Sequence, residues 1–166
     1  MALSVMSPRL PIPGASAVLA AVAASGVAGP RWAFEGFLPR AGRERRERIA
    51  AIAGDTRGTV VFEAPGRVAA TLRDLATACG EDRAGAVARE LTKIHEQIER
   101  GTLGTLVLAV DEGRIPKRGE FVIVVGMGEA TGGSAARGEA ARRVAADTGL
   151  PRRRLYGIGE GPGDDA

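Results

Sequence analysis

The sequence predicts an α/β fold, a mixed sheet flanked by helices, with a small C-terminal helical appendage. Segments whose apolar residues recur at helical spacing alternate with short β-branched runs, which is the pattern of strands covered by helices. One pair of strand-like segments has no helix between them, so the sheet should be mixed. With 166 residues, of which 45% are hydrophobic, the chain can bury one ordinary core.

The limits of the expected helices come from turn and capping residues. Pro13 and Gly14 make a tight turn, Ser16 can cap the helix that follows, and Gly26 can end it. Gly80 closes a later helix in the same way. Buried strands are expected where β-branched and aliphatic residues run together. In chain order we expect a helix over 17–25, a strand over 31–34, a helix over 40–54, a strand over 59–62, a helix over 68–79, strands over 84–89 and 94–100, a helix over 102–110 and a strand over 121–125.

The expected helix over 40–54 is strongly basic in its first half. Five arginines and two glutamates precede Ile49 and Ile52, the apolar residues of this segment. Cations at the start of a helix oppose its dipole, so their presence has a structural cost. The pattern therefore fits either a solvated face or a surface that contacts phosphate groups.

The stretch 86–106 contains the only histidine of the chain and several charges. An apolar run leads directly into Arg89 and the charged residues after it. Burying an unpaired charge is costly, so this density predicts either the rim of a cleft or a solvated strand with balanced charges. If residues 94–100 form a strand, His95 and Glu96 lie on opposite faces of it.

Composition narrows the class of protein. Lysine and arginine number 23 against 20 aspartates and glutamates, and the net charge of +3 permits an acidic partner such as RNA. The single cysteine, Cys79, excludes an internal disulfide and fits a reducing cytoplasm. The apolar run over 15–27 is too short for a membrane span, and fits a buried helix better than a signal-peptide core. One histidine and one cysteine far apart predict no metal site.

The composition changes after the last expected strand. Gly126, Met127 and Gly128 suggest a dinucleotide-binding loop, but Thr131 stands where the third glycine belongs, so a linker explains them better. The following basic segment has the outline of a helix-turn-helix. The expected parts are an irregular lead-in over 1–10, the α/β domain over 11–126, a linker over 127–137, the basic helical tail over 138–157 and a disordered end over 158–166.

Five motifs carry a resemblance to a known family. They are P-I-P-G-A-S-A-V-L-A-A at 11–21, F-E-G-F-L-P-R at 34–40, V-F-E-A-P-G-R at 61–67, A-R-E-L-T-K-I-H-E with R-G-T-L at 88–103, and G-E-F-V-I-V-V at 119–125. In this order they resemble the bacterial 16S ribosomal RNA cytidine 2′-O-methyltransferases, within the tetrapyrrole-methylase-like superfamily. The resemblance covers about 11–125 and implies the C-terminal domain of a class III S-adenosylmethionine-dependent methyltransferase.

The resemblance also implies roles for individual residues. Residues expected near S-adenosylmethionine are Ser16, Ala17, Glu63, Ala64, Leu91 and Thr92. Lys93 and His95 are candidates to orient the ribose hydroxyl or to accept its proton, with Glu90 or Glu96 fixing the partner group. RNA contacts are expected from Arg43, Arg45, Arg46, Arg48, Arg67, Glu96, Arg152, Arg153 and Arg154.

The sequence departs from the family in two respects. Gly66 stands where the family usually has a histidine, and neither the glycine-rich loop nor the Asp-Ala-Gly-type loop of the N-terminal domain is present. The S-adenosylmethionine site is therefore expected to be incomplete in this chain. Expected partners are 16S rRNA or the small ribosomal subunit, a separately encoded N-terminal half and a second copy in a homodimer, in the cytoplasm and away from membranes. A non-catalytic basic RNA- or DNA-binding remnant and a truncated inactive fragment are the alternatives.

Overall fold

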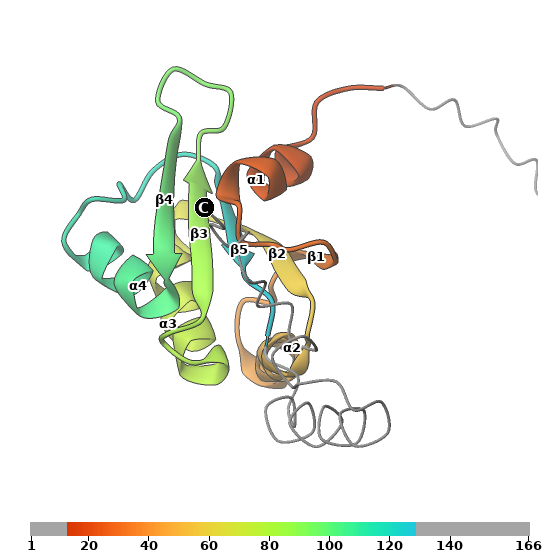
Figure 1. Cartoon of the computed structure of the whole chain (residues 1–166). Coiled ribbons are helices and arrows are strands. Elements are labelled where there is room, and N and C mark those ends of the chain that lie inside the picture. The colour runs from red at the N-terminus through yellow and green to blue at the C-terminus, as the bar shows by residue number, and fades with distance from the viewer. Residues whose placement is uncertain (1–12, 129–166) are drawn as a thin grey trace, which may run out of the picture. The chain divides into compact units, whose positions relative to one another are not determined.

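The computed structural model describes residues 13–128, which form a five-stranded sheet with four α-helices (Figure 1). The elements are α1 (Ala17–Ser25), β1 (Trp32–Phe37), α2 (Gly42–Gly54), β2 (Gly58–Glu63), the 3-10 turn η1 (Pro65–Arg67), α3 (Val68–Cys79), β3 (Ala84–Arg89), β4 (Gln97–Thr102), α4 (Leu103–Asp111) and β5 (Phe121–Val125). Among these residues, no helix is both long and apolar enough to cross a membrane.

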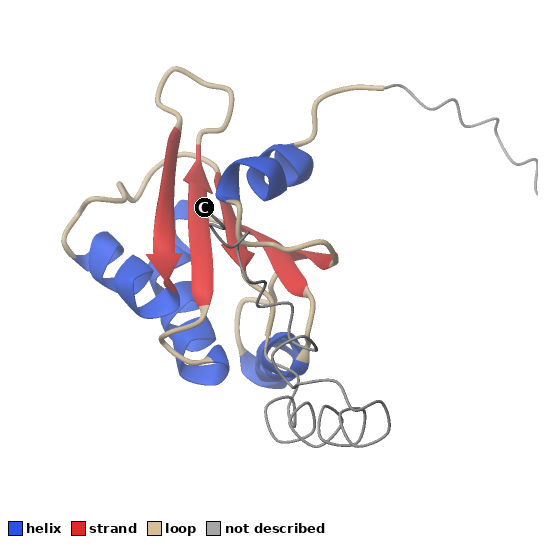
Figure 2. Ribbon diagram, viewed as in Figure 1, coloured by secondary structure: helices blue, strands red, loops and turns tan. Residues whose placement is uncertain are grey.

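The sheet is mixed, with the strand order β1-β2-β5-β3-β4 (Figure 2). The edge strand β1 runs parallel to β2, whereas β5 pairs antiparallel with both of its neighbours and β3 pairs antiparallel with β4. The last strand in sequence therefore lies in the centre, where all five residues of β5 are buried. This confirms the predicted mixed α/β sheet.

Two apolar cores lie on the opposite faces of the sheet. Alternate residues of the inner strands face α2, α3 and α4 on one side, among them Val61, Val87 and Ile123. Their sequence neighbours face the other side, where the small and β-branched residues of α1 cover them. Because successive side chains of a strand point to opposite faces, the same strands contribute to both cores, as expected for a sheet covered by helices on both faces.

Capping and periodicity give correct limits for several elements. The observed limits of α1, α3, β3 and β5 are those predicted, and α1 ends at Gly26, which has a φ of 70°. The helix after Thr102 is also confirmed, because Thr102 and Thr105 form a reciprocal capping box there. β1 extends three residues further than predicted and contains a register shift between Phe34 and Gly36.

The predicted start of β4 is wrong. Residues 94–96 form turns, and the strand begins at Gln97. The alternation of isoleucine with charged residues imitates a strand, but main-chain bonds from Lys93 to Glu90 and from Glu96 to Lys93 curl this segment. His95 and Glu96 therefore lie in a connection, as Lys93 does, and not on opposite faces of a strand.

The chain divides into two compact units after Gly128. The second unit lies outside the described residues, as does the predicted lead-in over 1–10. The predicted helical tail over 138–157, the end over 158–166 and most of the linker over 127–137 are therefore not described, and these divisions stay predictions.

A close backbone approach at Gly58 gives a test of this packing. A Cβ at this position would lie 2.2 Å from the carbonyl oxygen of Ala28, whereas a Cβ at Gly54 meets nothing within 4 Å. We expect Gly58→Ala to lower the free energy of unfolding by about 1–3 kcal/mol, because a backbone segment must shift. Gly54→Ala should leave it unchanged within about 1 kcal/mol. Equal urea midpoints for the two variants would contradict the observed contact.

Candidate functional site

The carboxyl ends of three strands meet at one edge of the sheet. Glu63 at the end of β2 and Arg89 at the end of β3 both pair in register with Phe121, the first residue of β5. Since β1 is parallel to β2, it ends at the same edge. The two segments predicted to hold the methyl donor, after β2 and after β3, therefore flank the start of one central strand.

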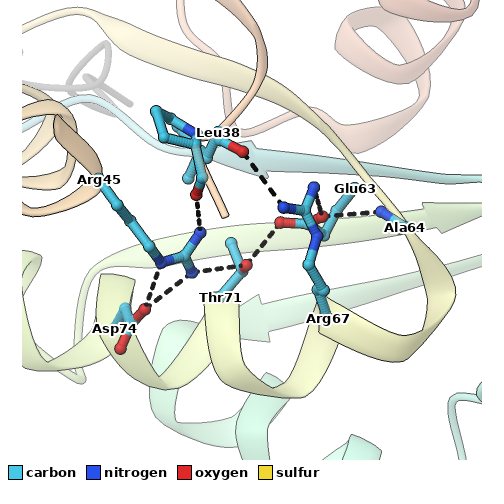
Figure 3. A network of polar contacts seen from close by, with 8 residues as sticks. Leu38, Arg45, Glu63, Ala64, Arg67, Thr71 and Asp74 are labelled. Carbon is cyan, nitrogen blue, oxygen red and sulfur yellow. Dashed lines mark hydrogen bonds and ion pairs between the residues drawn. The ribbon is translucent and has the colours of Figure 1, made fainter. Parts of the chain in front are cut away.

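Glu63 is a buried carboxylate at this edge, and its side chain has no exposed surface. Its Oε1 pairs with Arg67 Nη2 at 2.5 Å and accepts the N–H of Ala64 at 2.8 Å, while its Oε2 accepts the Thr71 hydroxyl at 2.6 Å (Figure 3). Both oxygens thus have donors, which offsets the cost of burying the charge. The turn after β2 is fixed by these bonds.

The same network continues to the loop after β1 (Figure 3). Arg45 of α2 donates to the Thr71 hydroxyl, to Asp74 of α3 and to the carbonyl of Pro39. Arg67 donates to the carbonyl of Leu38 at 3.3 Å. Two arginines therefore tie residues 38–39 to the first turns of α3.

These contacts bear on three predicted roles. The carboxylate of Glu63 is fully engaged, so this residue can shape a donor pocket through its backbone and the turn it fixes. The Arg45 side chain is only 10% exposed, and its guanidinium is bound to protein groups. Arg67 is bound in the same network, to Glu63 and to the carbonyl of Leu38. The geometry favours a structural role for both arginines over the predicted phosphate contacts.

A second polar centre holds the turn between β3 and β4. Glu90 Oε1 accepts the N–H of Glu120 at 2.8 Å and pairs with Lys93 Nζ at 3.1 Å. Lys93 also pairs with Glu120 Oε2 at 3.1 Å. The Glu120 amide and the Lys93 ammonium hold the pKa of the Glu90 carboxyl below its usual value, and the two carboxylates raise the pKa of Lys93. Both groups are charged at neutral pH in this arrangement.

The backbone of this turn is strained and tightly bonded. Glu90 and Thr92 have φ values of 50° and 63°, in the left-handed region that non-glycine residues rarely adopt. The N–H of Thr92 donates to Glu96 Oε2 at 2.7 Å, which stabilises the curl. Backbone strain of this kind is concentrated at functional sites, since the surrounding structure must hold it in place.

The side chain of Arg89 holds the far end of the turn between β3 and β4 in place. This side chain is buried, and it donates to the carbonyls of Arg118 and His95 at 2.6 and 3.2 Å. His95 and Ile94 are exposed at the apex, and the imidazole of His95 makes no hydrogen bond with the described residues. The predicted catalytic residues Glu90, Lys93 and His95 are thus brought together in one rigid turn.

The remaining residues predicted to lie near S-adenosylmethionine are at the start of α1 and in the turns after β2 and β3. Ser16 is the half-buried N-cap of α1 and Ala17 is its exposed first residue. Leu91 is half-buried and packs against the core beneath α1. Ala64 is half-buried in the turn after β2, and Thr92 is exposed. Their roles at S-adenosylmethionine stay predictions.

The basic residues of α2 differ in their availability. Arg43 pairs with Glu47 and Arg48 pairs with Glu35, whereas Arg46 is exposed and has no ion pair within residues 13–128. Ion pairs at the surface are weak, so Arg43 and Arg48 can still exchange these partners for phosphate. Three further predicted RNA contacts, Arg152, Arg153 and Arg154, lie outside the described residues.

Four side chains of the two networks were not predicted as site residues from sequence, namely Thr71, Asp74, Arg89 and Glu120. A charge at the end of a buried strand, as for Arg89, was the one available signal.

The histidine usual in the family at Gly66 would also fit, because this position is exposed and a Cβ there meets nothing within 4 Å. Within the described part of the chain, no three acidic, cysteine or histidine residues could hold a metal ion.

A comparison with family models defines the class of protein. Residues 10–107, more than half of the chain, match the tetrapyrrole (corrin/porphyrin) methylases, and the chain belongs to this family. A solved cobalt precorrin-4 methyltransferase of cobalamin biosynthesis has a TM-score of 0.54 and 20% sequence identity, covering 69% of this chain and 50% of that chain. At this identity the likeness supports the fold alone.

Similar curated proteins carry one name. The ribosomal RNA small subunit methyltransferase I of Synechocystis sp. is 40% identical over 165 residues, which is 89% of this chain and 58% of that protein. Its counterpart from Xylella fastidiosa is 41% identical over 162 residues, 89% of this chain and 59% of that protein. The chain therefore spans a little over half the length of these relatives.

The buried Glu63 network makes a testable prediction. Arg67→Ala leaves a buried carboxylate without its ion-pair partner, although Thr71 and the Ala64 amide remain. We expect a loss of about 1–3 kcal/mol in the free energy of unfolding, measured by urea denaturation. The control Arg43→Ala removes an exposed pair and should cost less than about 0.5 kcal/mol. Equal losses in the two variants would contradict the network's structural role.

Proposed function

We propose that this chain is the part of an S-adenosylmethionine-dependent methyltransferase that holds one wall of the donor site and contacts small-subunit ribosomal RNA. The reaction is methylation of the 2′-hydroxyl of a cytidine, with the rest of a full-length relative supplying the opposite wall, in the cytoplasm. The supporting observation is that the turns after β2 and β3 meet at one sheet edge, in a chain 40% identical to a ribosomal RNA small subunit methyltransferase I.

The turn after β3 offers suitable groups for an adenosine. The Leu91 side chain is half-buried and supplies an apolar surface. Among the described residues, neither the N–H nor the C=O of Leu91 has a hydrogen-bond partner, so both can bind a polar base edge. Pockets for such ligands combine apolar walls with a few placed polar groups. Leu91, Thr92 and Ala64 would line the adenosine, and Ser16 and Ala17 would lie near the methionine part.

The chemistry requires a ribose hydroxyl to be held in line with an activated methyl group and to lose its proton. S-adenosylmethionine would supply that methyl group from its sulfonium. Lys93 is a poor proton acceptor, because its raised pKa keeps it charged, and it suits orienting an oxygen or a phosphate. His95 carries an exposed imidazole at the same apex. We assign His95 as the proton acceptor, and Glu90 as the residue that fixes Lys93.

Phosphate contacts would come from the exposed arginines of α2 and from the basic tail. α2 follows β1 after a short connection, and Arg45 in its first half contacts Thr71 and Asp74 in α3, the helix that follows the turn after β2. Arg46 is the best placed, since its guanidinium has no ion pair to exchange among the described residues. Contacts of this kind make binding strongly dependent on salt.

The direct test is methyl transfer to small-subunit ribosomal RNA. The isolated chain should neither bind S-adenosylmethionine saturably in calorimetry nor transfer its methyl group. Mixed with the segment of the Synechocystis relative that lies outside the match, it should place a methyl group on a ribose, read by mass spectrometry of RNA digests. His95→Ala should lower kcat by about 100-fold or more, since general base catalysis contributes 10²–10⁴.

Two results would contradict this assignment. Saturable binding of S-adenosylmethionine by the isolated chain would show that this chain can hold the methyl donor without the rest of a full-length relative. Full activity of His95→Ala would remove the base assignment. Salt-sensitive RNA binding without methyl transfer in the mixture would instead support a non-catalytic RNA-binding remnant, and loss of both would support an inactive fragment.

The arginine contacts can be tested separately by filter binding of small-subunit ribosomal RNA across salt concentrations. Arg46→Ala should weaken binding and reduce the slope of log affinity against log salt by about 1. The matched control is Arg73→Ala, in an exposed arginine of α3 that pairs with Asp111. A slope that Arg46→Ala leaves unchanged would exclude α2 from the RNA surface.

A further inference from the structure

A second loop packs against the turn between β3 and β4. This loop is the connection 112–120, which leads from α4 to β5 past the end of β3 (Figure 1). The guanidinium of Arg89 donates to the carbonyls of both Arg118 and His95, at 2.6 and 3.2 Å. Gln97, at the start of β4, donates to the carbonyl of Arg114 at 2.7 Å. The main chains of the two loops are therefore held side by side.

The two loops approach each other most closely at Glu90. Its N–H donates to the carbonyl of Glu120 at 3.0 Å, and its carboxylate accepts the N–H of the same residue at 2.8 Å. A Cβ at Gly119 would lie 2.7 Å from the Cγ of Glu90, and Gly119 has a φ of 100°, a conformation that favours glycine. Because these contacts fix both backbones, side chains exposed on the two loops belong to one surface.

The two loops expose free cations and one isolated apolar side chain. Lys117 and Arg118 are exposed, and neither forms an ion pair within residues 13–128. On the other loop Ile94 is 95% exposed, next to the exposed His95. The residues on both sides of Ile94, over 92–96, are polar and exposed. Ile94 is thus an apolar tip in polar surroundings.

The carboxylates of the two loops are bound to other groups. Glu90 and Glu120 pair with Lys93, Glu96 accepts the N–H of Thr92, and Glu99 and Glu112 pair with Arg114. These bonds use the charge of Lys93 and Arg114 within the loops. Lys117 and Arg118 are left to bind an anion from outside.

We propose that Ile94, Lys117 and Arg118 form a surface that binds an unpaired stretch of RNA, with the two cations on its phosphates and Ile94 against a base. Phosphates attract free cations, and a single apolar side chain can pack against or between bases. A protein partner would instead need a contiguous apolar core, which the polar neighbours of Ile94 do not provide.

Unpaired RNA fits this surface better than a double helix does. The bases of a single strand can be splayed out against protein side chains, whereas those of an A-form helix are stacked and lie in grooves that side chains read poorly. The inference rests on the proposed function in one respect, that RNA is the substrate. It adds the residues that would hold the nucleotides beside His95, the assigned proton acceptor.

RNA binding by the intact chain, without the methyl donor, tests the cations. A labelled single-stranded RNA is followed by fluorescence anisotropy across salt concentrations. Lys117→Ala and Arg118→Ala should each reduce the slope of log affinity against log salt by about 0.7, the contribution of one phosphate contact on a single strand. The matched control is Arg31→Ala, because Arg31 is exposed, has no ion pair among the described residues and lies at the opposite end of the sheet, where β1 and β2 begin. Its slope should equal that of the native chain.

The apolar tip is tested with the same RNA, single-stranded and annealed to its complement. Ile94→Ser should weaken binding of the single strand about 5-fold or more, because contact between an apolar side chain and a base is lost. Binding of the duplex should stay within 2-fold of the native value. The substituted side chains are exposed, and a thermal unfolding midpoint equal to the native one checks that each variant is folded.

The outcomes separate this proposal from the proposed function. If Lys117→Ala and Arg118→Ala leave the slope unchanged while Arg46→Ala lowers it, this surface is wrong and RNA binding through α2 stands. If the native chain binds no RNA, both are wrong. Equal losses on single strand and duplex in Ile94→Ser would overturn the choice of unpaired RNA. If Ile94→Ser leaves RNA binding unchanged but weakens binding of the segment of the Synechocystis relative outside the match, a protein covers Ile94 and the proposal fails.

Discussion

The burial of the Glu63 carboxylate at the end of β2 constrains the rest of this fold. A charge without exposed surface is tolerated only if each oxygen has a donor. Arg67 and Thr71 supply these donors from the turn and helix that follow, and Arg45 extends the network from α2 to Thr71 and Asp74. The path of the chain after β1 and after β2 is therefore fixed by one buried group. Packing of apolar side chains alone would leave these loops free to move.

Hydrogen bonds of charged side chains also fix the backbone at the end of β3. Arg89 and Glu90 use main-chain carbonyl and amide groups as partners, and they hold a turn whose backbone is strained at Glu90 and Thr92. The exposed Lys93 and His95 are carried on this turn. The two polar centres lie on either side of β5, and together they fix the backbone of both turns at this edge of the sheet.

The sequence predicted the fold well where local chemistry decides it. Gly26 and Gly80 end helices, and the short apolar run of β5, rich in β-branched residues, forms a fully buried strand. The sequence-based prediction failed over 94–96, where alternating isoleucine and charge imitate a strand, because main-chain bonds from Lys93 to Glu90 and from Glu96 to Lys93 curl the chain. Arg45 was predicted as an RNA contact because it lies in a basic segment, and Arg67 because it lies in a motif that resembles the RNA-modifying family. Arg45 is buried by contacts with Thr71 and Asp74, which lie 26 and 29 residues away in sequence, so local patterns do not reveal them.

The central claim is that the turns after β2 and β3 together form one wall of the methyl-donor site. Amide chemical-shift mapping tests it most directly, with S-adenosylhomocysteine titrated into the labelled chain bound to the remainder of the Synechocystis relative. We predict shifts concentrated at Glu63 to Arg67 and at Glu90 to Glu96, with little change along the groove between α3 and α4. Shifts that gather in that groove, around Thr77 and Thr105, and spare both turns would contradict the account.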